Sequence, residues 1–500
     1  MKKLLLATST LLFAAFTWAG IIGDANNDGF VDVADITSIA SHILGTTPEG
    51  FSAENADVNG DGTIDVADIT GTAQIILGGP TIDDNTVLVN YNGTTANVQV
   101  ANNIKDMISV TVDGADVSIV AAEALDKEVN YILRGTTTDG MFMMDGDYKC
   151  TITLDGVSIT NNDNAAIDIE CGKRIAIVAA DKTGNSFTDG TGKQKAAFFV
   201  KGHAEIEGGG TINIIGNAKH AYRSDEYTQL KKKFTGQFNV LASASDGMHV
   251  GQYFQMNNGN VNISNIGGDG IQVEGEKKSE EADNGNCIIK GGAINITVDS
   301  IDNDALNIDS LVIISGGKID IVNNGGARWE EEEQGIGGSA AISGKAFTCS
   351  DATINIKATG AGGKGISVDE DVTIEAGSKI SIVTLGDVFE MNGDDTKPQC
   401  IKADHNIFIR GGAETYVEAF SMYGKGFSFD DESGEGQFTV DAYVLAVGEK
   451  KSEPTGGEMP WLTFTKQNIQ GGQEYTIGGM TFTAPEGFSN KSAKVLVAYQ

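Results

Sequence analysis

The chain has 500 residues, which exceeds one ordinary domain and predicts either several units or one long repetitive unit. Acidic residues number 69 against 35 basic ones, so the formal net charge is −34. A surface this negative repels nucleic acid and anionic membranes, and we expect neither as a partner. Gly occurs 65 times and Pro only 6 times. This composition indicates a folded acidic protein with many short strands and tight turns.

The segment MKKLLLATSTLLFAAFTWA (1–19) combines two lysines, an apolar run and small residues at its end. This pattern is typical of a secretory signal peptide, here cleaved after Ala19. The apolar run is too short to span a membrane, and we expect no membrane insertion. The protein is therefore expected to be secreted, either extracellular or in a cell-surface complex. Five cysteines follow, an odd number, and we expect them to be buried unpaired thiols.

Two copies of a calcium-loop pattern follow, DANNDGFVDVAD (24–35) and DVNGDGTIDVAD (57–68). Each places Asp or Asn oxygens at loop positions 1, 3, 5, 9 and 12 and Gly at position 6. Calcium prefers six to eight hard oxygen ligands, and this Gly permits the sharp turn around the ion. We expect two Ca²⁺ ions, with position 7 contributing a backbone carbonyl. The expected ligands are Asp24, Asn26, Asp28, Phe30, Asp32 and Asp35, then Asp57, Asn59, Asp61, Thr63, Asp65 and Asp68.

A helical apolar pattern follows each loop and is ended by Gly45 or Gly78. Residues 20–79 contain ten acidic residues and no Lys or Arg, so they need cations to stay compact. The pair of loops and helices resembles a dockerin, the module that attaches secreted proteins to cohesin-bearing scaffolds. The resemblance implies a cohesin partner, which would contact Val33, Ala34, Val66 and Ala67, where Ser or Thr is often found. The alternative is that the calcium loops only stabilise the chain.

Beyond a short linker (80–85), a motif of a small residue, an apolar residue, any residue and usually another apolar one recurs along the chain. Two further strand patterns follow each copy. Three short strands with period-2 alternation in about 24 residues are typical of one coil of a parallel β-helix. The general crossover preference predicts right-handed coils. We expect an all-β fold, a right-handed three-faced parallel β-helix (86–435) with C-terminal capping strands (436–500), preceded by the small α-helical, EF-hand-like dockerin module (20–79).

Three stretches carry a second resemblance: LRGTTTDGMFMMDGDYKCTITLDGVSITNNDNAAIDIE (133–170), GGDGIQVEG (267–275) and GGQEYTIGGMTFTAPEGFS (471–489). They resemble a family of secreted carbohydrate-binding β-helix proteins that are related in fold to polysaccharide lyases. The shared motifs are mostly structural glycines and core aliphatic residues. The resemblance implies the β-helix fold and the binding of an acidic polysaccharide.

Two rows of side chains are expected to point outward, because a residue between two inward apolar neighbours faces the other side of its strand. Such flat polar faces suit hydroxyl-rich polymers, and polar ladders on a solvated sheet are the alternative. The row on strand one is Arg223, His249, Gln272, Asn307, Ser343, Ser367, Lys402 and Ser428. The row on strand three is Asn213, Asn262, Asn295, Asp320, Asn355 and Ser381.

The corner before strand one is expected to carry Asp246, Asp269 and Asp304 on consecutive coils. Three stacked carboxylates repel one another, so a bound cation or a cationic neighbour should relieve them. Two longer repeats insert loops at this corner, one with Trp329 and the other with Asp394 and Asp395. We expect a metal or sugar site here, with the Trp329 indole stacking on a sugar ring. The alternatives are aspartates that only shape turns and a loop anchored by its tryptophan.

These features favour a non-catalytic protein that binds a plant cell-wall or acidic polysaccharide, such as pectin, polygalacturonate or cellulose, and docks onto a cohesin-bearing scaffold. The alternative is a calcium-dependent, pectate-type polysaccharide lyase, for which Arg223 and His249 are the catalytic candidates. A glycosidase and a purely structural or adhesion protein also remain open.

Overall fold

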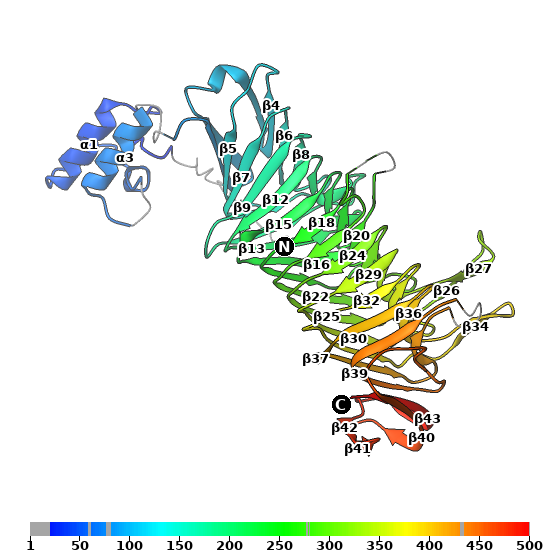
Figure 1. Ribbon diagram of the computed structural model, residues 1–500. Coiled ribbons are helices and arrows are strands. Elements are labelled where there is room, and N and C mark those ends of the chain that lie inside the picture. Colours follow the sequence, from blue (N-terminus) through cyan, green and yellow to red (C-terminus); the bar gives the residue numbers. More distant parts are fainter. Residues whose placement is uncertain are drawn as a thin grey trace, which may run out of the picture. The chain divides into compact units, whose positions relative to one another are not determined.

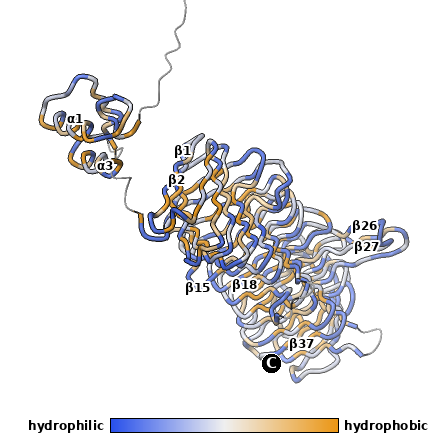
Figure 2. Tube along the Cα trace, turned by 90° about the horizontal axis from the view of Figure 1, so that it is seen from above, coloured by the Kyte–Doolittle hydropathy of each residue, from blue (hydrophilic) through white to orange (hydrophobic). Residues whose placement is uncertain are grey.

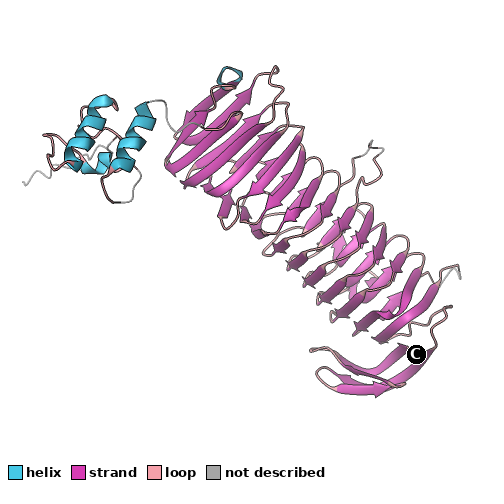
Figure 3. Cartoon of the chain, turned by 60° about the vertical axis from the view of Figure 1, so that its left-hand side comes forward, coloured by secondary structure: helices cyan, strands magenta, loops and turns pink. Residues whose placement is uncertain are grey.

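The computed structural model describes residues 21–58, 62–76, 82–276, 279, 281–430 and 435–499. The predicted signal peptide and two predicted ligands, Asn59 and Asp61, lie outside these residues. The chain divides into two compact units, Met1–Asp83 and Asp84–Gln500. Within the described parts, α-helices occur only in the first unit, and the second is built of strands apart from one short 3-10 helix, η1 (Lys105–Met107) (Figures 1 and 3). None of the described helices is long and apolar enough to cross a membrane.

The first unit contains helices α1 (Val33–Ile43), α2 (Ala53–Ala56) and α3 (Val66–Ile76). α1 and α3 follow the two predicted calcium loops and pack against each other. Among the described residues of this unit, the apolar core is small, and its fully buried members are Ala25, Ile39 and Ala56. So little buried apolar surface stabilises a unit of this size only weakly.

The second unit consists mainly of two large sheets. In its middle, each repeat supplies three strands that pair in parallel with those of the next repeat, as β17, β18 and β19 do with β20, β21 and β22. This agrees with the predicted three-strand repeat, and the predominantly β class is confirmed.

The 13-stranded sheet contains, in order, β3 (Ile108–Asp113), β4 (Ala115–Ala121), β6 (Gly140–Asp145), β8 (Ile167–Glu170), β11 (Ala196–Val200), β14 (His220–Ser224), β17 (Met248–Val250), β20 (Ile271–Val273), β23 (Leu306–Ile308), β28 (Ala340–Gly344), β31 (Lys364–Val368), β36 (Gln399–Ala403) and β38 (Lys425–Ser428). The 24-stranded sheet contains β1 (Thr86–Gly93), β2 (Thr95–Val100), β5 (Val129–Thr137), β7 (Cys150–Thr160), β9 (Arg174–Ala179), β10 (Gly184–Thr188), β12 (His203–Gly208), β13 (Thr211–Gly216), β15 (Thr228–Phe234), β16 (Gln237–Ser243), β18 (Phe254–Met256), β19 (Asn260–Ile263), β21 (Cys287–Ile289), β22 (Ala293–Val298), β24 (Leu311–Ile314), β25 (Lys318–Asn323), β29 (Ala346–Cys349), β30 (Thr353–Ala358), β32 (Val372–Ile374), β33 (Lys379–Thr384), β37 (Ile407–Ser421), β39 (Phe438–Gly448), β40 (Trp461–Gln470) and β43 (Ser489–Ala498).

Three hairpins stand apart from these sheets. They are β26 (Arg328–Glu330) with β27 (Gly335–Gly337), β34 (Phe389–Met391) with β35 (Asp394–Thr396), and β41 (Glu474–Ile477) with β42 (Met480–Thr483). The β26–β27 hairpin projects from the stack of strands (Figures 1 and 2).

Packing explains why the recurring motif begins with a small residue. A Cβ atom added to Gly270 would lie 2.4 Å from the carbonyl oxygen of Ala305, and one on Gly365 would lie 2.3 Å from that of Cys400. The next repeat therefore approaches too closely for a larger side chain. Figure 2 shows apolar residues alternating with polar ones around the repeats, and the buried positions of each strand are mostly Ile, Val, Leu, Phe and Ala.

Antiparallel strands occupy both ends of this unit. At the N-terminal end β1 pairs with β2 and β3 with β4, which the sequence did not predict. At the C-terminal end β39 pairs in parallel with β37, and β43 then pairs antiparallel with both β39 and β40. All five cysteines are free and buried, as predicted.

Candidate functional site

The first calcium loop is organised by its carboxylates. Asp24 accepts hydrogen bonds from the backbone N–H groups of Asp28 (3.0 Å) and Gly29 (2.9 Å). Asp35 is fully buried, and each of its oxygens accepts one further N–H group of the loop. Gly29 has φ = 95°, a backbone conformation that favours glycine. The loop is therefore folded around the acidic side chains that were expected to bind calcium.

The second loop repeats this arrangement. Asp68 is fully buried and accepts from the N–H groups of Val58 (2.8 Å) and Asp65 (2.9 Å), while Asp57 Oδ2 accepts from Gly62 N–H (2.9 Å). Asp57 Oδ1 is buried and has no hydrogen-bond partner among the described residues. A buried carboxylate oxygen without a partner is costly unless a cation compensates it. The donor set therefore fits a hard cation.

The predicted partner-binding residues lie in the first turns of α1 and α3. Val33 and Val66 each have 66% of their surface exposed, and Ala34 and Ala67 are exposed as well. Each helix begins with the same cap, in which Asp32 or Asp65 accepts the second helical N–H at 2.7 Å. Two equivalent, exposed apolar sites thus occur in one unit.

The strand-one row predicted from the sequence has the expected register. Arg223 pairs with His249, which pairs with Gln272, and the order continues through Asn307, Ser343, Ser367 and Lys402 to Ser428. One expectation fails, because His249 is only 4% exposed and does not face solvent. The row is therefore not a uniform solvated face.

The strand-three row is a hydrogen-bonded ladder. Asn239, which the sequence analysis missed, joins Asn213 to Asn262 through amide hydrogen bonds of 2.9 and 2.8 Å. Asn295 continues the ladder at 2.8 Å, and Asn355 donates to Asp320 Oδ1 at 2.7 Å. The side chains of successive repeats thus serve as hydrogen-bond partners for one another, which supports the alternative of a stabilising polar ladder.

The three corner aspartates connect successive repeats. Asp246 Oδ1 accepts the backbone N–H of Asp269 (3.1 Å), Asp269 Oδ1 accepts that of Asp304 (2.7 Å), and Asp304 Oδ1 accepts that of Ala340 (2.7 Å). Asp246 and Asp269 are 6% and 7% exposed. The expectation that they present carboxylates to a polymer is wrong for these two residues, because their oxygens are used inside the protein.

Burial shifts the pKa values of the corner aspartates. It raises the pKa of Asp269 to about 6 and that of Asp304 to about 7. For Asp246, burial acts in the same direction, but contacts with His220 and His249 outweigh it and hold its pKa below the usual value. Burial therefore favours the protonated forms of Asp269 and Asp304, whereas contacts with the two imidazoles favour the carboxylate of Asp246.

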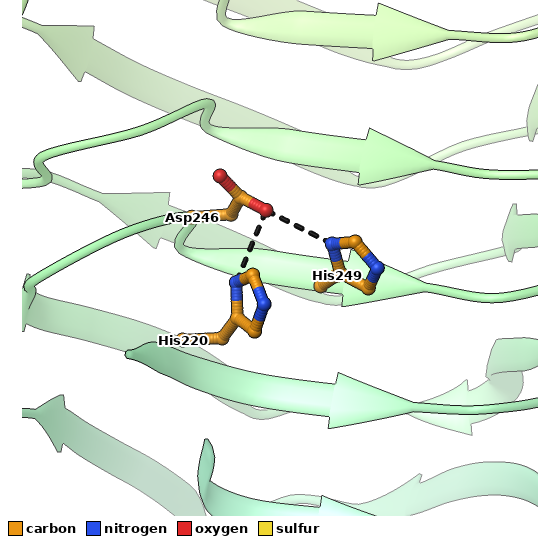
Figure 4. Close-up of side chains that lie close together, drawn as sticks. All are labelled: His220, Asp246 and His249. Carbon is orange, nitrogen blue, oxygen red and sulfur yellow. Dashed lines mark hydrogen bonds and ion pairs between the residues drawn. The ribbon is translucent and has the colours of Figure 1, made fainter. Parts of the chain in front are cut away.

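Two histidines converge on Asp246. Asp246 Oδ2 lies 3.0 Å from His220 Nδ1 and 2.9 Å from His249 Nδ1 (Figure 4). The three residues come from adjacent strands, β14 and β17, and from the turn before β17. Arg223, the second catalytic candidate, pairs instead with Asp225 (2.8 Å), which also binds Lys195 (2.8 Å). The two catalytic candidates therefore take different carboxylate partners.

The two inserted loops form the hairpins β26–β27 and β34–β35, and β27 lies against β35. The first is tied to the corner by an ion pair between Arg328 and Asp302 (2.7 Å). Trp329 is half-buried, and its Nε1 is buried without a hydrogen-bond partner in the described structure. Asp394 and Asp395 are exposed, and Asp395 pairs with Lys397.

A pocket of about 500 Å³ lies beyond the second hairpin, at the end of the strand-one sheet. Four lysines line it together with two aspartates, Phe429 and Ser428. The lysines are Lys397, Lys402, Lys425 and Lys450. Lys402 pairs with Asp404 and Lys397 pairs with Asp395, so two of the four lysines already contact a carboxylate, while the lysines that line the pocket outnumber its two lining aspartates. This concentration of basic residues is opposite in sign to the chain as a whole.

Sequence reasoning found Lys402 but missed the other pocket lysines and His220. The sequence offered little indication of these residues. Lys425 and Lys450 lie outside the recurring motif, and His220 directly precedes Ala221, the small residue that begins an imperfect copy of the motif. Only the parallel pairing places His220 of β14 opposite the turn that carries Asp246.

Comparison with known proteins identifies both parts of the chain. Residues 113–362 match the model of a family described as carbohydrate-binding domain-containing protein, which is half of the chain. The chain belongs to this family. Residues 22–74 match the dockerin type I domain, which binds calcium and implies a cohesin partner. The recognition made from the sequence is therefore confirmed for both parts.

One curated relative is a carbohydrate-binding domain-containing protein of Acetivibrio thermocellus, 29% identical over 117 residues. The match covers 21% of this chain and 41% of the relative, so the chain spans about two fifths of that protein. Among solved structures, a polysaccharide lyase-like protein from C. thermocellum, in its gadolinium derivative, is 23% identical with a TM-score of 0.40. That match covers 48% of this chain and 91% of the other.

Proposed function

We propose that this protein is a secreted, non-catalytic polysaccharide-binding component of a cohesin-bearing scaffold, and that its ligand is an acidic polysaccharide of the polygalacturonate type. Residues 20–79 act as the docking module, and residues 86–435 form a right-handed parallel β-helix whose strands present the ligand site, with 436–500 as its cap. The family match to a carbohydrate-binding domain supports the class of ligand.

The observation that carries the choice of an acidic ligand is the lysine-lined pocket. Uronic-acid polymers carry one carboxylate on each sugar, and lysine ammonium groups bind such carboxylates by charge-assisted hydrogen bonds. A chain with a net charge of −34 would otherwise repel an anionic polymer. Four lysines in one pocket provide a local exception. The contact is therefore direct, and it replaces the cation bridge that the sequence alone suggested at the corner aspartates.

The test replaces Lys402, Lys425 and Lys450 with Gln in one variant, and Lys193, Lys232 and Lys379 in a matched control. The control lysines are exposed and lie outside the pocket, so both variants lose the same charge. We expect the pocket variant to bind polygalacturonate about tenfold more weakly, since each exposed ion pair contributes up to about 1 kcal/mol, and the control to bind normally.

Binding should weaken at high salt and persist in chelator, because lysine contacts are screened by ions but need no calcium. Equal weakening in both variants would contradict the pocket assignment. Loss of binding in chelator would return the site to a calcium bridge, for which Asp304, Asp394 and Asp395 are the remaining candidates, with Trp329 as the stacking residue.

In the docking module, we propose that both loops hold calcium through the twelve ligands expected from the sequence. The buried, unpaired Oδ1 of Asp57 and the buried carboxylates of Asp24, Asp35 and Asp68 support this assignment. Bound calcium supplies charge compensation to ten acidic residues that have no basic neighbour in the segment. The cohesin would contact the exposed Val33-Ala34 and Val66-Ala67 pairs.

A polysaccharide lyase is the second candidate, and one observation favours it. Burial, the charge of Lys402 and partial compensation by Asp304 leave the pKa of Lys364 below its usual value, as a lysine acting as base at C5–H requires. Lys364 lies on β31, next to the β36 strand of Lys402. The absorbance of unsaturated uronides decides between the candidates. An increase that disappears in Lys364→Met would establish a lyase, and no increase is expected for the binding protein.

A further inference from the structure

The cluster of His220, Asp246 and His249 differs from the rest of the corner ladder. Asp269 and Asp304 use their second oxygen to bind the outward residue of the next repeat, Asn307 at 2.8 Å and Ser343 respectively. Asp246 instead turns its second oxygen toward two imidazoles, one from the preceding strand and one from its own. All three side chains are at least nine-tenths buried, with 3%, 8% and 6% of their surface exposed.

We propose that His220, Asp246 and His249 form a binding site for a late first-row divalent metal ion, foremost Zn²⁺. The donor atoms are His220 Nδ1, Asp246 Oδ2 and His249 Nδ1, and all three face one another (Figure 4). Two nitrogen donors and one carboxylate suit zinc and its neighbours, whereas calcium binds oxygen ligands. The site is therefore distinct in chemistry from the two dockerin loops.

The spacing of the donor atoms fits a coordination sphere. Ligands that lie about 2.1 Å from a common ion are separated by roughly 2.9 to 3.4 Å, depending on whether the geometry is octahedral or tetrahedral. The two Nδ1–Oδ2 distances are 3.0 and 2.9 Å. The two imidazole rings are 4.4 Å apart between centroids and are tilted by 31°. All three donor atoms lie within 4.8 Å of one another, so an ion can be held once the two nitrogens approach it.

The hydrogen-bond capacity of His249 also points to a cation. Its Nδ1 faces Asp246 Oδ2 and its Nε2 lies 3.3 Å from Glu274 Oε2, so each ring nitrogen faces a carboxylate oxygen. A neutral imidazole has one N–H and can satisfy only one of the two acceptors. His249 Nε2 makes no hydrogen bond in the described structure, although Glu274 Oε2 is 3.3 Å away. With a metal ion on Nδ1, the proton would reside on Nε2 and could turn to Glu274, an arrangement common around metal-bound histidines. A protonated His249 without metal is the competing arrangement.

The surroundings hold the ligands in place. Asp246 Oδ1 accepts the backbone N–H of Asp269 at 3.1 Å, which fixes the orientation of the carboxylate. Both ring nitrogens of His220 are buried and make no hydrogen bond in the described structure, which leaves Nδ1 available to an ion. The site is enclosed by protein, so we assign the ion a structural role that joins two neighbouring repeats.

The experiment uses the full chain, stripped of metal by chelation and then returned to excess calcium so that the dockerin loops are filled. Titration with Co²⁺ should produce visible d–d absorption that saturates at about one ion per chain and is displaced by Zn²⁺. Zn²⁺ should also raise the melting temperature of the second unit by at least about 2 °C. Wild-type protein that gives neither signal would overturn the proposal and favour the protonated histidine.

Variants assign the site. His220→Gln, His249→Gln and Asp246→Asn should each abolish the cobalt absorption, and Glu274→Gln should weaken binding about tenfold or more by removing the carboxylate beside His249 Nε2. His203→Gln is the matched control, because His203 is also stacked on a ring and lies 3.9 Å from Glu226, but has no second histidine. Circular dichroism without metal checks that each variant is folded. Cobalt uptake that persists in any folded ligand variant would overturn the proposal.

Discussion

At the scale of single residues, the corner aspartates show how burial changes the role of a charged side chain. Both carboxylate oxygens of Asp304 accept hydrogen bonds inside the protein, Oδ1 from the N–H of Ala340 and Oδ2 from the hydroxyl of Ser343. A carboxylate in this position links one repeat to the next whether or not it is ionised. Its ionisation, however, carries a cost because burial disfavours the charged form.

This cost predicts a pH dependence of stability. Burial raises the pKa of Asp304 to about 7, so the folded state holds this proton more tightly than the unfolded chain. The stabilisation is complete below the unfolded pKa near 4 and is lost as pH rises through 7. Relative to the unchanged protein, Asp304→Asn should therefore have a higher free energy of unfolding at pH 8 than it has at pH 5. Denaturant unfolding at both pH values measures this difference. Asp394→Asn, at an exposed position, is the control and should show no such difference.

The small positions give a second residue-scale prediction. Gly270→Ala places a Cβ 2.4 Å from the backbone oxygen of Ala305 and should destabilise the second unit by about 1 to 3 kcal/mol, because backbone must move. Gly184→Ala meets no atom within 4 Å and should be neutral or slightly stabilising. Thermal melts of both variants test this, and equal melting temperatures would contradict the packing explanation.

At the scale of elements, α1 and α3 are near-equivalent copies. Each begins with an aspartate cap, exposes one valine to the same extent and carries a threonine hydroxyl bonded to that valine's carbonyl at 3.0 Å. Two copies of one surface allow a partner to bind either helix.

The parallel strands are equivalent in a different sense, because each of them needs the next repeat to complete its hydrogen bonds.

Dual docking predicts unequal effects of single and double changes. Replacing Val33-Ala34 with charged residues should weaken capture of a matching cohesin by about twofold, since one of two equivalent surfaces is lost. Replacing Val66-Ala67 as well should abolish capture, measured by surface-immobilised cohesin in excess calcium. Complete loss after the first pair alone would show that only α1 binds.

At the scale of the whole molecule, the two units are stabilised differently. The first has a core of three fully buried apolar residues and depends on charge compensation, whereas buried apolar side chains line the second along its length. Ion binding supplies folding free energy where a core is small. The two units should therefore respond independently to a change in calcium.

Hydrogen exchange on the full chain with calcium and with chelator tests this independence. Chelation should remove protection from the amides of α1 and α3 and leave most strands of the second unit protected. Protection of the helices that survives chelation would show that calcium is not required for their folding. Loss of protection throughout the second unit that is restored by calcium alone would show that its stability also depends on calcium.

Much of this protein could be read from its sequence, because the informative patterns are local. The expected calcium ligands lie within twelve-residue loops, and the strand-one row follows from strict period-2 alternation, so its register from Arg223 to Ser428 could be predicted. Tertiary structure alone decided what those side chains face. The alternation predicts that the side chain of His249 points outward, and yet it is buried. Asp246, Glu274 and His220 from the preceding repeat enclose it. The lysine pocket likewise joins residues from three separate segments, 397–404, 424–430 and Lys450. Alternation determines on which side of a strand a residue lies, whereas its surroundings depend on contacts between repeats that are distant in the sequence.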